Sequence, residues 1–151
     1  MTGVRSFAIS TDRIGPRRWC WVRIHPDADS LRRAGHRHRP DNGRGWWDEC
    51  YGCFQPARYE QDTTGDVHYP PNGYAGVLRL SRPDLTAEIA AHELVHAAAT
   101  IYRMNVTRTI RLGDGHTGFE REEDFAYIYG ELYASFEAGW HALEDPMASI
   151  S

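Results

Sequence analysis

Hydrophobic positions are concentrated in two stretches near the N-terminus, residues 4–10 and 18–24. Both are rich in β-branched and aromatic side chains, and Gly15 and Pro16 lie between them. This pattern predicts two strands that can form a hairpin. Alternation in the second strand places three residues on each face: Trp19, Trp21 and Arg23 on one, and Cys20, Val22 and Ile24 on the other. We expect the second, more apolar set to face the core.

The next stretch, residues 25–45, is polar and contains several glycines and prolines. It predicts a loop, with at most a short helical turn near residues 30–33. Basic side chains cluster in residues 32–39. They could dock an acidic partner or nucleic acid. We favour a solvated loop, because no aromatic residues interleave with the charges.

The second half of the chain has patterns typical of one strand and two helices. Residues 74–81 read as a strand after a Pro-Pro-Asn-Gly turn. An Ala-rich helix follows, with Asp84 as its expected N-cap and an end near residues 102–105. A second long helix is expected from about residue 120 to residue 143. Its apolar stripe has helical spacing: Phe125, Ile128, Tyr129, Leu132, Tyr133, Phe136 and Trp140.

These elements predict an α+β fold, in which a small mixed or antiparallel sheet packs on the two helices. The 151 residues suit a single domain, and 41% hydrophobic and 25% charged residues are ordinary globular values. A net charge of −4 gives no reason to expect nucleic acid or a membrane as partner. We expect a cytoplasmic protein, because no signal peptide or membrane span is evident and three cysteines do not indicate a disulfide framework. The oligomeric state cannot be read from the sequence.

The first helix carries His92, Glu93 and His96 in the spacing H-E-x-x-H. Side chains four residues apart lie on one helix face, so the two imidazoles can bind one zinc ion and Glu93 can reach a water on it. Apolar neighbours leave this helix little polar face, so we expect it to be largely buried. Buried histidines need a partner, and a metal ion is one.

A catalytic zinc usually has three protein ligands and one water. We expect the third ligand from the acidic start of the last helix, although those carboxylates could also only complement the helix dipole. Glu123 is the first choice, because it shares a face with Ala126, Tyr127 and Gly130, where small residues permit close helix packing. Glu122 and His116 are the alternatives.

Cys50 and Cys53 form a C-x-x-C pair. Such a pair can hold half of a structural zinc site, but Cys20, His25, His36 and His38 do not supply a standard second half. A redox pair is the other functional interpretation. The favoured interpretation is two reduced cysteines or half of an irregular site, with a second zinc the lesser alternative.

The motif and the later glutamate together resemble the zincin metallopeptidases of the gluzincin type. Glu123, Ala126 and Tyr127 are similar to the family pattern E-x-x-[SA]-[DY], in which the Glu is the third zinc ligand. The ImmA/IrrE-like peptidases of phages and bacteria are similar in length and in the order of strand and motif. The resemblance covers residues 74 to about 140. It implies one zincin-like domain, residues 1–151, with an irregular and β-rich part (1–73) and a catalytic core (74–145).

The resemblance implies a zinc-dependent peptidase acting on a peptide or protein substrate. Zinc would be held by His92, His96 and Glu123, and Glu93 would act as general base. His116 on a glycine-flanked loop is the first choice for a second oxyanion donor, followed by Tyr127 and Tyr102. The strand at residues 76–81 would align an extended substrate.

Two other functions remain open at this point. One is a zinc-containing module with a structural or inactive site, whose basic stretch, residues 32–39, contacts nucleic acid or a regulatory partner. Such a site has no need of Glu93, which favours the enzyme. The other is a metal-dependent hydrolase that uses the same residues on a non-peptide amide.

Overall fold

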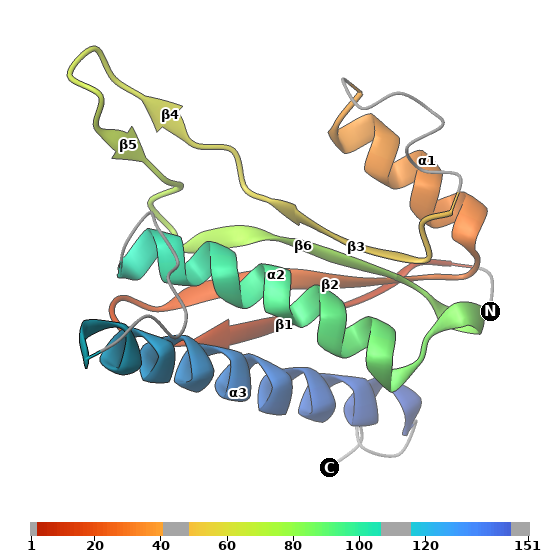
Figure 1. The fold of residues 1–151 in the computed structure, drawn as a ribbon. Coiled ribbons are helices and arrows are strands. Elements are labelled where there is room, and N and C mark those ends of the chain that lie inside the picture. The colour runs from red at the N-terminus through yellow and green to blue at the C-terminus, as the bar shows by residue number, and fades with distance from the viewer. Residues whose placement is uncertain (1–2, 41–48, 107–115, 146–151) are drawn as a thin grey trace.

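The computed structural model describes residues 3–40, 49–106 and 116–145, with the side chains of the last segment described from residue 122. The fold is α+β, as predicted (Figure 1). Its elements in chain order are β1 (Arg5–Thr11), β2 (Arg18–His25), α1 (Ala28–His38), β3 (Gly52–Pro56), β4 (Glu60–Gln61), β5 (Val67–His68), β6 (Tyr74–Ser81), a 3-10 turn (Arg82–Asp84), α2 (Ala87–Asn105) and α3 (His116–Glu144).

Four strands form a mixed sheet in the order β1-β2-β6-β3. β2 and β6 run parallel, whereas β1 on one edge and β3 on the other are antiparallel to their neighbours. The two-residue strands β4 and β5 pair in a separate hairpin that extends away from the sheet (Figure 1). β6 therefore lies inside the sheet, and β3 is an edge strand.

Helices lie on both faces of the sheet (Figure 1). We call the face that carries α2 and α3 the inner face and the face that carries α1 the outer face. On the inner face, α3 packs on β1 and on α2, and α2 packs on β6 and β3. The main core fills this layer. Cys20, Val22 and Ile24 are buried there, which confirms the predicted core side of β2.

The predicted N-terminal hairpin is confirmed, since β1 and β2 pair from Arg5 opposite Ile24 to Thr11 opposite Arg18. Asn105, the last residue of α2, ties down the turn of this hairpin. Its side-chain amide donates hydrogen bonds to the carbonyl oxygens of Ile14 (2.8 Å) and Pro16 (3.0 Å), and its side-chain oxygen accepts one from Arg18 Nε (2.8 Å).

The prediction of a loop at residues 25–45 is wrong for its described part. Residue 25 ends β2, and α1 forms an 11-residue helix in which the Asp27 carboxylate caps the backbone N–H of Ser30 at 2.7 Å. Leu31 and Gly35, four residues apart, are buried against the outer face. A single apolar side chain per helix turn is a weak sequence signal, which is why the helix was missed.

The predicted strand at residues 74–81 and the helix after it are confirmed, but the helix begins later than expected. Thr86 is the N-cap of α2 and accepts a hydrogen bond from the Ile89 backbone N–H. Asp84 instead accepts one from the Ser81 hydroxyl at 2.6 Å, within the 3-10 turn. The helix ends at Asn105, within the predicted range.

The long C-terminal helix is also confirmed. Ile128, Leu132 and Phe136 of its apolar stripe are buried, whereas Tyr133 is exposed. Residues 107–112, expected to be a strand or an extended loop, lie outside the described residues. In the described part of the chain, no helix combines the length and apolar character that a membrane crossing requires.

Candidate active-site cleft

A cleft of about 520 Å³ separates helix α2 from the edge strand β3. Residues from both elements and from the segment before β3 line it: Glu49, Cys50, Gly52, Cys53, Phe54, Pro56, His92, Glu93, His96, Ala99, Thr100 and Arg103. The cleft therefore contains all three residues of the H-E-x-x-H motif and both residues of the C-x-x-C pair.

His92 and His96 lie together on the solvent side of α2, with their Nε2 atoms 3.3 Å apart. Both side chains are exposed, so the expectation that they are buried is wrong. The helix instead buries the face with Leu94, Ala97 and Ile101 against the core. Two nitrogens that bind one tetrahedral zinc ion at the usual bond lengths are about 3.3 Å apart. The histidine pair has this spacing, which a direct N–H···N hydrogen bond between the rings also allows.

Glu93 lies below this pair and is the buried member of the motif, with 8% of its surface exposed. Its Oε1 is 3.9 Å from His92 Nε2. Burial raises the pKa of its carboxyl group, and the two histidines and a hydrogen bond from the Phe54 backbone N–H oppose that rise. The structure thus places a shielded carboxylate next to both imidazoles.

Gly52 lets strand β3 approach this carboxylate closely. A Cβ atom at Gly52 would lie 2.8 Å from Ile89 Cγ2 and 3.4 Å from Glu93 Cγ. Any larger residue would push β3 away from α2 or force Ile89 to move.

Strand β3 pairs with β6 along one edge only. Along its other edge, backbone N–H and C=O groups that do not bond to β6 face the cleft. The Phe54 N–H points to Glu93, and the Gly52 carbonyl oxygen accepts a hydrogen bond from Cys50 Sγ at 3.1 Å. An edge of this kind can pair with an extended peptide. The expectation that residues 76–81 align the substrate is wrong, because β6 is already paired on both sides, to β2 and to β3.

The expected packing of Glu123 towards the histidines is wrong. Glu123, Ala126, Tyr127 and Gly130 are all exposed, so this face of α3 points to solvent. The larger apolar stripe occupies the helix interface instead, for example through the contact of Phe125 with Tyr102. Burying large apolar side chains gains more free energy than burying small ones, and this sets the rotation of α3.

Among the other expected residues with described side chains, Tyr127, Tyr102 and Glu122 do not line the cleft. Tyr127 lies under the Arg13 guanidinium, 4.2 Å from the ring centroid. Tyr102 is buried in the core. His116 is the first residue of α3 rather than part of the preceding loop, and its side chain lies outside the described residues, as does that of Glu120. Glu122 is exposed.

Among the described residues, no three His, Cys, Asp or Glu side chains are grouped closely enough to share a metal ion. The histidine pair is thus the only part of the expected ligand set that the described structure assembles. Sequence reasoning missed two residues of the cleft, Thr100 and Arg103, which follow His96 by one and two helix turns. Their helical spacing from the motif is the signal that could have found them.

Cys50 and Cys53 are free thiols at the end of the cleft next to α1. Cys53 is buried and packs with Leu31, while Cys50 is half-buried. A hydrogen bond between the two thiols lowers the pKa of Cys50, against the effect of burial. The same bond and burial raise the pKa of Cys53. Both cysteines are free thiols, and among the described residues no third His, Cys, Asp or Glu is grouped with them closely enough to share a metal ion.

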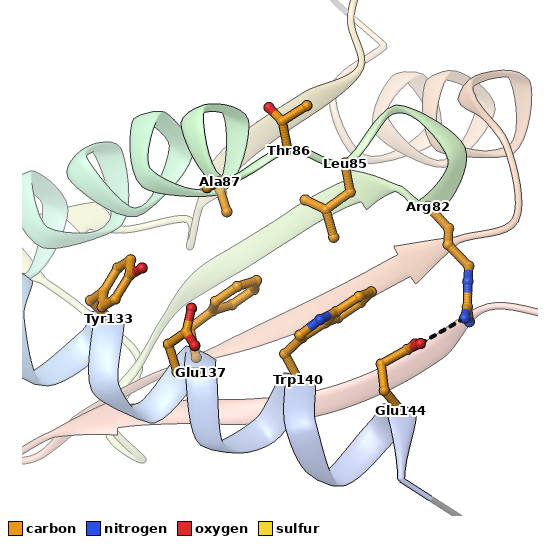
Figure 2. A pocket seen from close by; sticks show the side chains of 10 residues that line it. Arg82, Leu85, Thr86, Ala87, Tyr133, Glu137, Trp140 and Glu144 are labelled. Carbon is orange, nitrogen blue, oxygen red and sulfur yellow. Dashed lines mark hydrogen bonds and ion pairs between the residues drawn. The ribbon is translucent and has the colours of Figure 1, made fainter.

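A second hollow, of about 350 Å³, lies between the start of α2 and the end of α3 (Figure 2). Tyr133 and Trp140 line it on α3, and an ion pair of 2.9 Å between Arg82 and Glu144 closes one end. Neither histidine nor cysteine lines this groove. The groups suited to metal or nucleophilic chemistry therefore concentrate in the cleft between α2 and β3.

No family model, no curated protein and no solved structure matches this chain. The functional interpretation therefore depends on the residues and geometry of the cleft.

Proposed function

We propose that the cleft between α2 and β3 is the active site of a zinc-dependent peptidase of the H-E-x-x-H type. The observation that carries the proposal is the 3.3 Å separation of the Nε2 atoms of His92 and His96, which fits two ligands of one zinc ion. The buried Glu93 beside them supports a catalytic site over a structural one, since a structural zinc has no use for an adjacent unliganded carboxylate.

His92 and His96 would hold the metal through neutral Nε2 atoms. When bound, zinc supplies a water of lowered pKa and a positive charge for the scissile carbonyl oxygen. Glu93 would accept the proton of the attacking water and pass it to the leaving amine, and the position of its carboxylate beside His92 supports this role. Arg103, further along the same wall, offers a cation to the carbonyl or carboxylate groups of a bound peptide.

A peptide substrate would lie along the outer edge of β3. The edge points into the cleft opposite the histidines, and backbone pairing there is independent of side-chain sequence. This pairing favours a peptide over an amide without a peptide backbone.

The decisive experiment measures zinc content and peptide cleavage in parallel. We expect about one zinc per chain in the wild-type protein. Glu93→Gln should keep the zinc and lose about 100-fold or more of the cleavage rate, because the general base is gone. His92→Gln should lose the zinc as well. Glu88→Gln, an exposed carboxylate on the same helix, is the matched control and should change neither.

Wild-type protein without zinc, or Glu93→Gln protein with full cleavage activity, would contradict the proposal. Glu123→Gln extends the experiment to the third ligand that the sequence predicts. Zinc affinity that falls with Glu123→Gln would mean that α3 turns this carboxylate towards the metal. Unchanged zinc affinity would exclude Glu123 as a ligand.

A further inference from the structure

Aromatic side chains from two strands form a continuous cluster on the outer face of the sheet. The rings of Trp19 and Trp21 meet edge to face with centroids 5.5 Å apart, and Tyr74 lies against Trp19 at 4.9 Å. All three side chains are partly exposed. Trp19 and Tyr74 occupy paired positions of β2 and β6, so these rings form a row across the sheet.

Further along β2 and β6, arginines continue the aromatic cluster on the same face of the sheet. The Arg23 guanidinium lies over the Trp21 ring, 4.9 Å from its centroid, and Nη1 donates a hydrogen bond to Ser6 Oγ. Arg79 is the direct partner of Arg23 in the register of β2 and β6. Arg37 of α1 contributes a third positive charge, since it lowers the pKa values of both Arg79 and His25, although less than burial does.

These positive charges are not neutralised within the described structure. Like charges in directly opposed positions of a sheet repel. Arg79 is held by Gln55 Oε1 at 2.8 Å, a neutral acceptor, and Arg23 by a neutral hydroxyl. Among the described residues, Arg82 is the only arginine with a carboxylate within 4.0 Å. Converging cations without counter-charges repel one another, and a bound anion would relieve this repulsion.

Next to these rings, the β1 side of the outer face carries short side chains. Helix α1 packs over β6 and β2, and Gln55 of β3 reaches its backbone. On β1, the residues paired with Arg23, Trp21 and Trp19 are Ser6, Ala8 and Ser10. Short side chains beside a row of rings leave room for planar groups to stack on the rings.

We propose that the outer face of the sheet binds single-stranded nucleic acid, with bases stacked on Trp19, Trp21 and Tyr74 and phosphates bound by Arg23 and Arg37. Stacking on aromatic residues of a sheet requires unpaired bases, and arginines beside them bind the backbone. An acidic peptide would satisfy the charges but would leave the rings unused. This proposal is independent of the peptidase proposal, because the site lies on the opposite face of the sheet.

The proposal revises the expectation that nucleic acid is not a partner. That expectation depended on the net charge of −4 and on the lack of aromatic residues interleaved with the basic residues 32–39. The fold supplies the aromatic residues from β2 and β6 instead, next to Arg37 of the basic stretch.

The test is fluorescence anisotropy of the full chain with a labelled thymidine oligonucleotide of about twelve nucleotides. We expect saturable binding that weakens about 7-fold when salt rises from about 50 to about 200 mM, for about two phosphate contacts. Absence of saturable binding at the lower salt concentration would overturn the proposal.

Two variants locate the binding on the outer face. Trp21→Ala should weaken binding about tenfold through lost stacking, and Arg23→Gln should weaken it and reduce the salt dependence. Arg82→Gln, an arginine outside this face, is the matched control and should bind as the wild type does. Circular dichroism reports whether each variant is folded. If Trp21→Ala fails to fold, Arg23→Gln decides.

Unchanged affinity in folded Arg23→Gln protein would contradict the proposal. A poly-glutamate peptide of similar length and charge tests the acidic-peptide alternative. Competition by this peptide as effective as that by unlabelled oligonucleotide would show that only charge matters, and would overturn the assignment to nucleic acid.

Discussion

The two faces of the sheet are built from the same strands, yet they differ sharply in chemistry. On β2, Cys20, Val22 and Ile24 point to the inner face and are buried under α2 and α3. The residues between them, Trp21 and Arg23, point to the outer face and stay partly exposed. The inner face is therefore a packed core, while the outer face keeps polar and aromatic groups at its surface.

Because of this difference, the residues that stabilise the fold and the residues proposed to bind ligands lie in different parts of the molecule. Apolar burial is concentrated in one layer, which leaves the outer face and the outer edge of β3 available for other groups. Both proposed sites lie at places where the inner core ends. The cleft lies between α2 and the edge strand β3, and the outer-face site lies beside α1, which supplies Arg37.

The largest expected effect follows from a deletion in the inner layer. Leu80 is fully buried, so Leu80→Ala should lower the free energy of unfolding by about 2–5 kcal/mol, through lost apolar contact and the cavity left behind. Urea denaturation measures this loss. Arg23→Gln on the outer face should cost less than about 1 kcal/mol, since it removes one partly exposed hydrogen bond. Equal losses would mean that the two faces contribute alike to stability.

An intermediate effect is expected at His25, a buried residue of the outer face whose Nδ1 lies 3.1 Å from Ser30 Oγ. Burial, followed by the charges of Arg79 and Arg23, lowers its pKa from 6.5 to about 4. Between these values the unfolded chain binds the proton and the folded chain does not. The contribution of His25 is therefore complete above about pH 6.5 and is lost as pH falls towards 4.

Urea denaturation of wild type and His25→Gln between about pH 4 and pH 7 tests this sign. The variant should show a weaker loss of stability as pH falls. His141→Gln, which removes an exposed histidine, should follow the wild-type curve. Parallel curves for wild type and His25→Gln would show that this residue is not held in the neutral form.

The smallest effect is expected at the rim of the inner layer. Arg82 and Glu144 form an ion pair of 2.9 Å between the turn before α2 and the end of α3 (Figure 2). Both side chains are well exposed, so Arg82→Ala should change the free energy of unfolding by less than about 1 kcal/mol. A thermal or urea unfolding curve measures it. A loss of unfolding free energy comparable to that of Leu80→Ala would mean that this ion pair stabilises the fold as much as a core residue does.

The elements that the sequence predicted correctly carry their signal in adjacent residues. The alternation in β2 and the helical stripe of α3 report directly which side chains the core will bury. The elements that were missed depend on distant partners. Strand β3 has a glycine and a proline among its five residues and is stabilised by pairing with β6. Helix α1 is anchored on the outer face by Leu31, which packs with Cys53 of β3.

The candidate site also has features that the sequence predicted and features that it did not. The spacing of His92, Glu93 and His96 on one helix was predictable, because a helix turn fixes the distance between side chains four residues apart. Their exposure was not, because it depends on which face of α2 the core covers. The opposite wall of the cleft comes from β3, and no local pattern connects that strand to the motif.

The amino-acid sequence by itself determined the hydrophobic periods, and through them the strands β1, β2 and β6, the helices α2 and α3, and the pairing of two imidazoles on one turn. Only the tertiary structure decided that β6 lies inside the sheet, that β3 faces the histidines, and that α3 turns Glu123 to solvent. It also placed Arg79 of β6 opposite Arg23 of β2. Local geometry is set by covalent spacing and backbone hydrogen bonds, whereas the choice of neighbours is set by the burial of apolar surface over the whole chain.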